Sequence, residues 1–214
     1  MLKLPLATAQ KLLFLGAHSD DIEIGCGGTI LELAANNSQL EIVWVVFSAD
    51  GKRRQEARSS ARVFLKGVGH TKVIVHSFKG SFFPVQAEAI KRSFEKLKGH
   101  FDPDMVFTHY REDRHQDHRL LSDLTWNTFR DHLILEYEIP KYDGDLGNPN
   151  LFLPLDESAC RRKVQQLCRM FGTQRNKHWF SEDTFLALMR LRGIECASKY
   201  AEAFHCRKLV CDGS

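Results

Sequence analysis

Two kinds of hydrophobic pattern alternate along most of the chain. Short runs of consecutive apolar residues are bounded by polar positions, which is typical of strands buried on both faces of a sheet. Such runs predict strands at residues 11–17, 41–47, 72–76, 105–108 and 133–137. The segments between them place apolar residues three and four positions apart, which predicts helices that bury one face.

This alternation predicts a doubly wound α/β fold of the Rossmann-like type. Strands that are each followed by a helix form a mainly parallel sheet, with right-handed crossovers and helices on both faces. The strand order expected for this class is 3-2-1-4-5. Residues 140–150 are rich in Gly, Pro and Asn, which favour turns, so we expect a loop there that lies near the functional site.

Helical spacing returns after that loop. Residues 160–171 predict one helix, and another is expected after Ser181, which is a favoured helix-capping residue. We expect these helices to form a C-terminal helical and loop elaboration of one domain that spans residues 1–214. The chain of 214 residues, with 43% hydrophobic and 27% charged residues, is long enough for a full hydrophobic core.

The distribution of charge argues against nucleic acid as a partner. The chain has 30 basic and 27 acidic residues, which gives a formal net charge of +3. The two signs are interspersed and form no basic stripe, so the expected partner is a small molecule. A homo-oligomer is compatible with the sequence.

Cysteine usage and the absence of a targeting pattern predict a cytoplasmic protein. The six cysteines include no C-x-x-C pair, and a chain of this size does not depend on disulfides, so reduced thiols are expected. Cys26 is expected to be structural, because the sequence places no base beside it. The apolar run at residues 12–17 is too short to cross a bilayer, and no integral membrane segment is expected. The cysteines are Cys26, Cys160, Cys168, Cys196, Cys206 and Cys211.

Metal-binding side chains follow the first and fourth predicted strands. The first strand leads into His18, Asp20 and Asp21, and the fourth is followed by His115 and His118. In a sheet of order 3-2-1-4-5, strands one and four are neighbours where the winding reverses, and ligands bind in the crevice there. Converging imidazole and carboxylate groups are typical of a catalytic zinc site with an open position for water. The same ligands would also bind Fe²⁺ or another divalent ion.

Several of these residues also have a structural explanation. Asp20 and Asp21 would cap the helix that follows. The glycines at 25–28 are better explained by close packing of that helix than by a nucleotide-binding loop, because no complete G-x-G-x-x-G is present. His109 and His178 are left outside the metal set, since a lone histidine beside aromatic residues is more often structural.

Two motifs give the sequence a resemblance to a known family. Residues 17–28 read A-H-S-D-D-I-E-I-G-C-G-G, and residues 115–118 read H-Q-D-H. Together they resemble A-H-P-D-D-x-E-x-G-x-G-G and H-P-D-H, the hallmarks of the PIG-L or LmbE-like de-N-acetylases, and the resemblance covers most of the chain. Carried over by position, it implies these roles: zinc ligands His18, Asp21 and His118; general base Asp20; transition-state imidazole His115; imidazole-orienting partner Asp117.

The resemblance is weaker at other positions. Ser19 and Gln116 stand where the family usually has proline. Neither position supplies a ligand, so the implied roles are kept, but the subfamily and the substrate stay open. A family-like R-x-x-E at Arg53 and Glu56 implies substrate binding, although exposed helix charges are the simpler explanation. The ending at residues 200–204 is also similar to family members.

Spacing alone implies only metal-dependent hydrolysis, whereas the resemblance implies a more specific function. It implies removal of an N-acetyl group from an N-acetylated amino sugar of the GlcNAc type, in a glycoside, a nucleotide-sugar or a glycan precursor. A metal-dependent phosphoesterase is the first alternative, because Asp and His at strand ends serve that chemistry as well. A non-catalytic sugar- or nucleotide-binding module is the second, although it would not need the extra carboxylate of Asp20.

Overall fold

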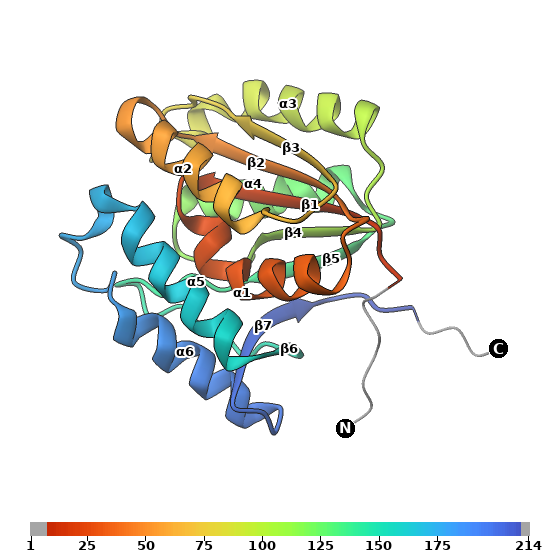
Figure 1. Ribbon diagram of the computed structural model, residues 1–214. Coiled ribbons are helices and arrows are strands. Elements are labelled where there is room, and N and C mark those ends of the chain that lie inside the picture. The colour runs from red at the N-terminus through yellow and green to blue at the C-terminus, as the bar shows by residue number, and fades with distance from the viewer. Residues whose placement is uncertain (1–7, 211–214) are drawn as a thin grey trace.

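The computed structural model describes residues 8–210, which form a seven-stranded sheet with helices on both faces (Figure 1). In sheet order the strands are β3 (His70–Val75), β2 (Glu41–Ser48), β1 (Lys11–His18), β4 (Met105–His109), β5 (Leu133–Tyr137), β7 (Tyr200–Cys206) and β6 (Leu151–Leu155). The first five pair in parallel, and β7 is antiparallel to β5 and β6. The predicted α/β fold and the order 3-2-1-4-5 are confirmed.

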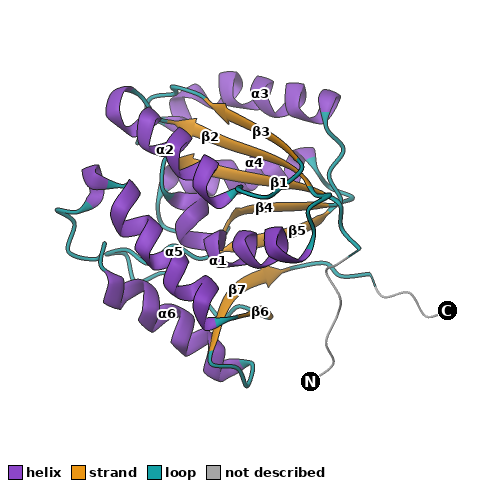
Figure 2. Cartoon of the chain, in the orientation of Figure 1, coloured by secondary structure: helices purple, strands orange, loops and turns teal. Residues whose placement is uncertain are grey.

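Two layers of helices enclose this sheet (Figures 1 and 2). Helices α1, α2, α5 and α6 bury their apolar residues against one face, and α3 and α4 cover the other. The predicted helices at residues 160–171 and after Ser181 are α5 and α6, and the Ser181 hydroxyl accepts the N–H of Thr184 as a helix cap. The helices are α1 (Asp21–Asn36), α2 (Gly51–Phe64), α3 (Ala87–His100), α4 (Gln116–Thr128), α5 (Glu157–Met170) and α6 (Glu182–Glu195), with 3₁₀ turns η1 (Phe83–Gln86) and η2 (Gly172–Gln174).

The central strands are buried on both faces, which explains their continuous apolar runs. Alternate residues point to opposite faces, so Phe14 and Trp44 join the core beside α1, while Leu13 and Val45 join the core beside α3. All four side chains are inaccessible to solvent. Burial of each such side chain is worth about 1.5–3 kcal/mol, which makes β1 and β2 a rigid base for the loops that follow them.

The C-terminal elaboration contains the predicted helices and loop, and it also adds two strands to the sheet, β6 and β7. β5 is followed by residues 138–150 and then by β6, not by a helix. β6 contains Pro154, which is unfavourable in a central strand but tolerated here because β6 is at the sheet edge. In β7 the buried Glu202 interrupts the hydrophobic pattern, and its charge is matched by a buried lysine on α5.

The glycines near the start of α1 allow close packing, as predicted. A Cβ atom at Gly25 would lie 2.2 Å from the ring of Tyr137, and one at Gly28 would lie 2.5 Å from Leu155. Any larger residue at either position would push α1 away from the sheet. The glycine cluster therefore fixes the depth at which the beginning of α1 meets β5 and β6.

α1 is kinked at Cys26, where φ is −142° and ψ is 19°. A buried ion pair satisfies the backbone groups that the kink releases. The Glu202 carboxylate accepts the N–H groups of Gly28 and Thr29 at 2.8 and 2.7 Å, and Lys163 Nζ lies 2.6 Å from Glu202. Lys163 also donates to a carbonyl in the preceding turn of α1. The C-terminal elements thus hold the helix that carries the first motif.

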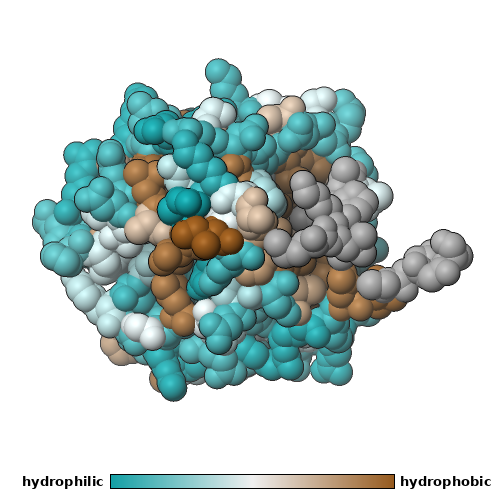
Figure 3. All heavy atoms as spheres, turned by 90° about the horizontal axis from the view of Figure 1, so that it is seen from below, coloured by the Kyte–Doolittle hydropathy of each residue, from teal (hydrophilic) through white to brown (hydrophobic). Residues whose placement is uncertain are grey.

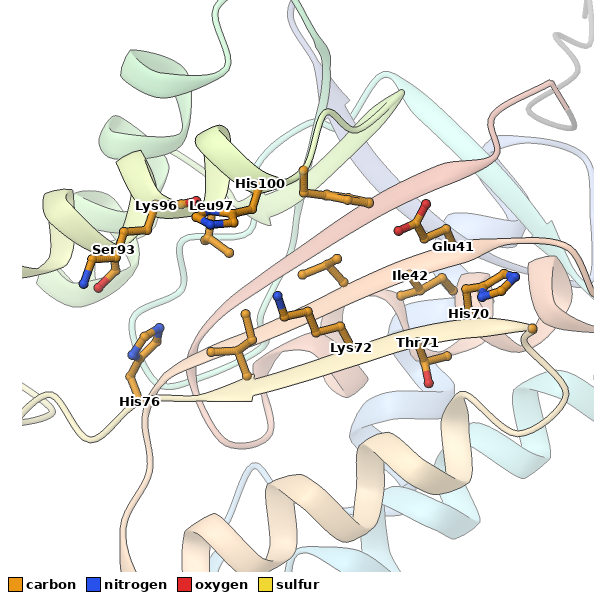
Figure 4. A pocket seen from close by; sticks show the side chains of 14 residues that line it. Glu41, Ile42, His70, Thr71, Lys72, His76, Ser93, Lys96, Leu97 and His100 are labelled. Carbon is orange, nitrogen blue, oxygen red and sulfur yellow. Dashed lines mark hydrogen bonds between the residues drawn. The ribbon is translucent and has the colours of Figure 1, made fainter.

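A groove of about 800 Å³ lies between β3 and α3, on one face of the sheet (Figure 4). No residue predicted for the functional site lines it. The groove is therefore a separate feature of the surface. Its basic and imidazole side chains are His70, Lys72, His76, Lys96 and His100.

No helix within residues 8–210 is long and apolar enough to cross a membrane. Apolar side chains are nonetheless exposed on α6, where Leu191 and Ile194 are 58% and 59% accessible. Figure 3, which views the molecule from the side on which α6 lies, shows hydrophobic stretches within a largely hydrophilic surface. Oligomerisation stays a prediction. The reduced state of the thiols also stays a prediction. Five of the six cysteines lie within the described residues and are free, and the sixth, Cys211, lies outside them.

Candidate metal centre

The two predicted residue groups meet where β1 and β4 lie side by side (Figure 1). β1 ends at His18 and α1 begins at Asp21, while the loop after β4 leads into α4 at Gln116. Because β1 and β4 are parallel, both loops leave the sheet at the same edge. The switch point of the doubly wound sheet therefore brings the motifs together.

The three predicted ligand residues place one donor atom each at the corners of a nearly equilateral triangle. Nδ1 of His18 lies 3.2 Å from Nε2 of His118 and 3.4 Å from Oδ2 of Asp21. Nε2 of His118 lies 3.5 Å from the same carboxylate oxygen. Ligand atoms that bind Zn²⁺ tetrahedrally at about 2.0–2.1 Å are about 3.3 Å apart. The triangle and its two-imidazole, one-carboxylate chemistry therefore fit a divalent ion with one open position.

A carboxylate orients each of the two imidazole rings. Asp117 Oδ2 lies 3.0 Å from Nε2 of His18, and Asp113 Oδ2 lies 2.9 Å from Nδ1 of His118. A ring that donates one N–H to a carboxylate presents the lone pair of its other nitrogen to a metal. The network therefore favours the tautomers that turn Nδ1 of His18 and Nε2 of His118 toward the triangle.

The electrostatic surroundings of the two rings differ. Burial lowers the pKa of His18, but the Asp21 and Asp117 carboxylates outweigh it and raise that pKa to about 9. Burial, with a contribution from His109, lowers the pKa of His118 to about 3. His118 is thus neutral, as a metal-binding imidazole must be, whereas the surroundings of His18 attract positive charge. Both properties suit a site for a cation.

Asp20 faces a different partner from its neighbour Asp21. Arg53 donates from Nη2 to Oδ1 of Asp20 at 3.0 Å and from Nε to the Ser19 hydroxyl at 2.9 Å. Burial and the charge of Asp21 raise the pKa of Asp20, and Arg53 opposes this effect. Asp20 is 4% exposed, and Arg53 holds its carboxylate. Ser19, at a position where proline is usual in the family motif, contributes to this anchor.

His115 caps α4 and stands beside the triangle. Its Nδ1 accepts the backbone N–H of Asp117 at 3.2 Å, which leaves the ring proton on Nε2. The ring packs against His18 and His118, with centroids 4.8 and 4.6 Å away. Burial and the charge of His18 lower its pKa. His115 is therefore placed to donate a hydrogen bond as a neutral imidazole.

Asp117 also fixes the loop that precedes η1. Its Oδ2 accepts the N–H of Ser81 at 2.6 Å, and its Oδ1 accepts the N–H of Phe83 at 3.0 Å. Ser81 has a φ of 65°, an unfavourable conformation for a residue with a side chain, and the Gln116 side chain donates to its carbonyl oxygen. Gln116, the second residue at a usual proline position, thus helps to hold this loop.

Two contacts of the candidate site were not predicted from the sequence. Asp113 belongs to the polar loop before the second motif, and its position five residues before His118 is the only signal that could have indicated its role. His109 was left outside the site, yet its Nε2 lies 3.2 Å from Oδ2 of Asp21 and its ring stacks on His118 with centroids 3.9 Å apart. The fully buried ring, whose Nε2 accepts the N–H of Ala17, lies against both predicted ligands.

Not all of the weighed residues join the site. Glu56 accepts hydrogen bonds from the backbone and hydroxyl of Thr173, so it fastens α2 to η2 and does not accompany Arg53. His178 is exposed and lies outside the clustered donor groups. Cys26 is buried and its thiol donates to a backbone carbonyl, while burial raises its pKa, as expected of a structural thiol.

The chain is similar to deacetylases in sequence and in fold. An Escherichia coli strain K12 protein described as an uncharacterized deacetylase, YaiS, is 30% identical over 126 residues, which are 53% of this chain and 66% of that protein. The match thus spans slightly less than two thirds of this relative. N,N'-diacetylchitobiose deacetylase from Pyrococcus horikoshii has a TM-score of 0.69 at 20% identity, over 94% of this chain and 85% of that one.

The same fold also occurs in an enzyme of another class. GalB, the 4-carboxy-2-hydroxymuconate hydratase from Pseudomonas putida KT2440, has a TM-score of 0.75 at 16% identity, over 96% of this chain and 99% of that one. At these identities the structures show the fold alone, and a fold does not determine a reaction. The sequence profile of the PIG-L family, described as GlcNAc-PI de-N-acetylase, matches residues 13–129, which is more than half of the chain. The protein therefore belongs to the PIG-L family.

Proposed function

We propose that the protein is a zinc-dependent hydrolase that removes the N-acetyl group from an amino sugar of the N-acetylglucosamine type. One observation carries the proposal: beside the triangle of metal-binding atoms stand a separate carboxylate, Asp20, on which the charges of Asp21 and His18 act, and a separate imidazole, His115. Amide hydrolysis needs a proton acceptor and a donor to the carbonyl oxygen in addition to a metal. Membership of the PIG-L family supports deacetylation as the reaction.

In this proposal His18, Asp21 and His118 hold the metal. When bound, a divalent ion lowers the pKa of water and polarises a carbonyl group. Asp113 and Asp117 keep the two imidazole rings in the required orientation. The described residues contain two overlapping donor groups that share His118, one with His18 and His115 and one with Asp21 and His109. Because the groups overlap, they favour one ion over the pair that a two-metal phosphoesterase would use.

In this proposal Asp20 transfers a proton, Arg53 orients Asp20, and His115 donates a hydrogen bond to the substrate. Asp20 accepts the proton of the attacking water and then delivers it to the departing nitrogen. Arg53 keeps the Asp20 carboxylate in one orientation. His115 donates from Nε2 to the carbonyl oxygen as negative charge develops there, which is the part of the reaction that hydrogen-bond donors accelerate most.

The proposed substrate class is supported by similarity. The description of the family and the name of the Pyrococcus horikoshii neighbour both refer to N-acetylated glucosamine derivatives as substrates. The fold shared with a hydratase makes water addition to an unsaturated acid the second candidate, since that reaction also needs an activated water. Release of acetate separates the two reactions.

We expect the purified protein to release acetate from at least one N-acetylglucosamine derivative, and removal of its metal to abolish that activity. The test is a panel of free, lipid-linked, nucleotide-linked and oligomeric N-acetylated sugars. Acetate is measured before and after dialysis against a strong chelator, and metal content is measured by elemental analysis. About one zinc per chain is expected, because the three atoms of the triangle form one tetrahedral site whose fourth position is left for water.

Restoring activity with zinc after dialysis is the control for damage by the chelator. A protein that contains almost no metal and hydrolyses its substrate equally well with chelator would contradict the proposal. Water addition without acetate release would favour the hydratase candidate instead.

We expect His115→Ala to retain metal and to lose about a hundredfold to a thousandfold in kcat, the usual cost of removing one donor to a developing oxyanion. The measurement is kcat together with zinc content. The matched variant is His118→Ala, which should lose metal. If His115→Ala is metal-free while His118→Ala remains loaded, the two histidines have exchanged roles.

A further inference from the structure

Residues 138–150, which connect β5 to β6, contact the candidate site through one buried ammonium group. Lys141 Nζ lies 3.0 Å from Oδ2 of Asp113 and 2.5 Å from Oδ2 of Asp145. The three side chains are 9%, 3% and 5% exposed. Asp145 also accepts the backbone N–H of Arg114 at 2.6 Å. The loop that the sequence placed near the site is therefore fastened to the loop that carries Asp113.

Asp113 is held by three groups that share its two carboxylate oxygens. Oδ1 accepts the backbone N–H of His115 at 2.8 Å, and Oδ2 accepts from Nδ1 of His118 at 2.9 Å. Lys141 pairs with the same Oδ2. Within residues 8–210, Lys141 is the one permanently charged group that forms an ion pair with Asp113. The carboxylate that orients His118 thus depends on Lys141 for its countercharge.

We propose that Lys141 is a positioning residue of the metal centre: its ammonium holds Asp113 against the His118 ring and couples residues 138–150 to that ligand. The inference rests on the proposed metal-dependent function. It assigns a role to a side chain that lies outside both sequence motifs and touches neither the metal-binding atoms nor the groups that act on the substrate.

The physical reason is the repulsion between two buried carboxylates. Without the ammonium, Asp113 and Asp145 would be two buried carboxylates that share no countercharge, and burial strengthens the repulsion between them. Oδ2 of Asp113 would keep His118 as its one partner, and the carboxylate would turn away from Asp145. His118 would then lose the acceptor that fixes its Nδ1–H and aims its Nε2 at the triangle. Loss of such an outer partner typically weakens metal binding about 10–100-fold.

The test compares zinc dissociation constants of full-length variants, measured by competition with a fluorescent chelator. Lys141→Met keeps most of the length of the side chain but removes its charge, and it should raise the zinc Kd about tenfold or more. With saturating zinc, its kcat should approach that of the unmodified protein. Lys91→Met is the matched control, because Lys91 pairs with Glu95 on α3 and with Thr128 at the end of α4 far from His118, and its zinc Kd should not change.

A second background separates positioning from general loss of structure. In Asp113→Ala, which itself should bind zinc about 10–100-fold more weakly, adding Lys141→Met should change the Kd by less than about twofold, because the effect passes through Asp113. If Lys141→Met does not fold, Lys141→Gln takes its place: it also removes the charge between Asp113 and Asp145 but keeps a polar group there, so its zinc Kd should likewise rise about tenfold, and an unchanged Kd would overturn the role of Lys141.

The outcomes distinguish this inference from the proposed function. Tight zinc binding by the unmodified protein with an unchanged Kd in folded Lys141→Met overturns the role of Lys141 alone. An undiminished effect of Lys141→Met in the Asp113→Ala background overturns it too. If the unmodified protein does not bind zinc, both the proposed function and this inference are wrong.

Discussion

Replacing Asp20 with asparagine is expected to lower kcat about a hundredfold to ten-thousandfold while leaving zinc content and KM little changed. Asparagine keeps the shape of the side chain and a hydrogen-bond acceptor for Arg53, but it does not accept a proton at neutral pH. The Asp20 carboxylate is bonded to Arg53 and is not a corner of the ligand triangle. Its loss should therefore slow proton transfer and leave the metal in place.

Asp21→Asn is the matched control, because it makes the same chemical change at the adjacent residue. Oδ2 of Asp21 lies within 3.5 Å of both ligand nitrogens, so this variant should bind zinc more weakly and regain part of its activity when zinc is added. The measurements are kcat, KM and zinc content of both variants over a range of added zinc. Rescue of Asp20→Asn by zinc, or a full complement of metal in Asp21→Asn, would contradict the division of roles.

The arrangement of the site could be predicted because the central strands carry an unambiguous pattern. β1 and β4 are continuous apolar runs that end in polar motifs, and the topology of a doubly wound sheet makes their ends neighbours. Adjacent strands in one sheet leave little freedom for the loops that follow them. The convergence of His18 and His118 follows from that topology before any distance is known.

The partners of these ligands were not predictable in the same way. Asp113 and Lys141 are charged residues in polar loops, where such residues are common and usually solvated. Their role depends on how the two loops lie against each other, and no local spacing encodes that. The sequence indicated that residues 140–150 lie near the site, but only the packed structure shows that Lys141 is the group that makes contact.

β7 was missed for a related physical reason. Its sequence places Glu202 among small residues, so neither a continuous apolar run nor a clear alternation is present. The strand forms because Lys163, from α5, supplies the countercharge, and because two N–H groups released by the kink in α1 bind the carboxylate. A long-range charge pair therefore takes the place of the hydrophobic signal on which strand prediction depends.

That dependence means that substitution of Glu202 should strongly destabilise the fold. Glu202→Leu would leave the buried Lys163 ammonium without a countercharge and the N–H groups of Gly28 and Thr29 without an acceptor. Removing one member of a buried ion pair typically costs about 3–5 kcal/mol in the free energy of unfolding, which urea denaturation measures directly. The matched variant, Glu202→Leu with Lys163→Met, buries no isolated charge and should recover part of this loss. Recovery should be incomplete, because the two N–H groups stay without an acceptor, which costs about 1–3 kcal/mol of stability for each. A cost below about 1 kcal/mol for Glu202→Leu, or a double variant less stable than the single one, would show that the ion pair does not hold α1 against the C-terminal strands.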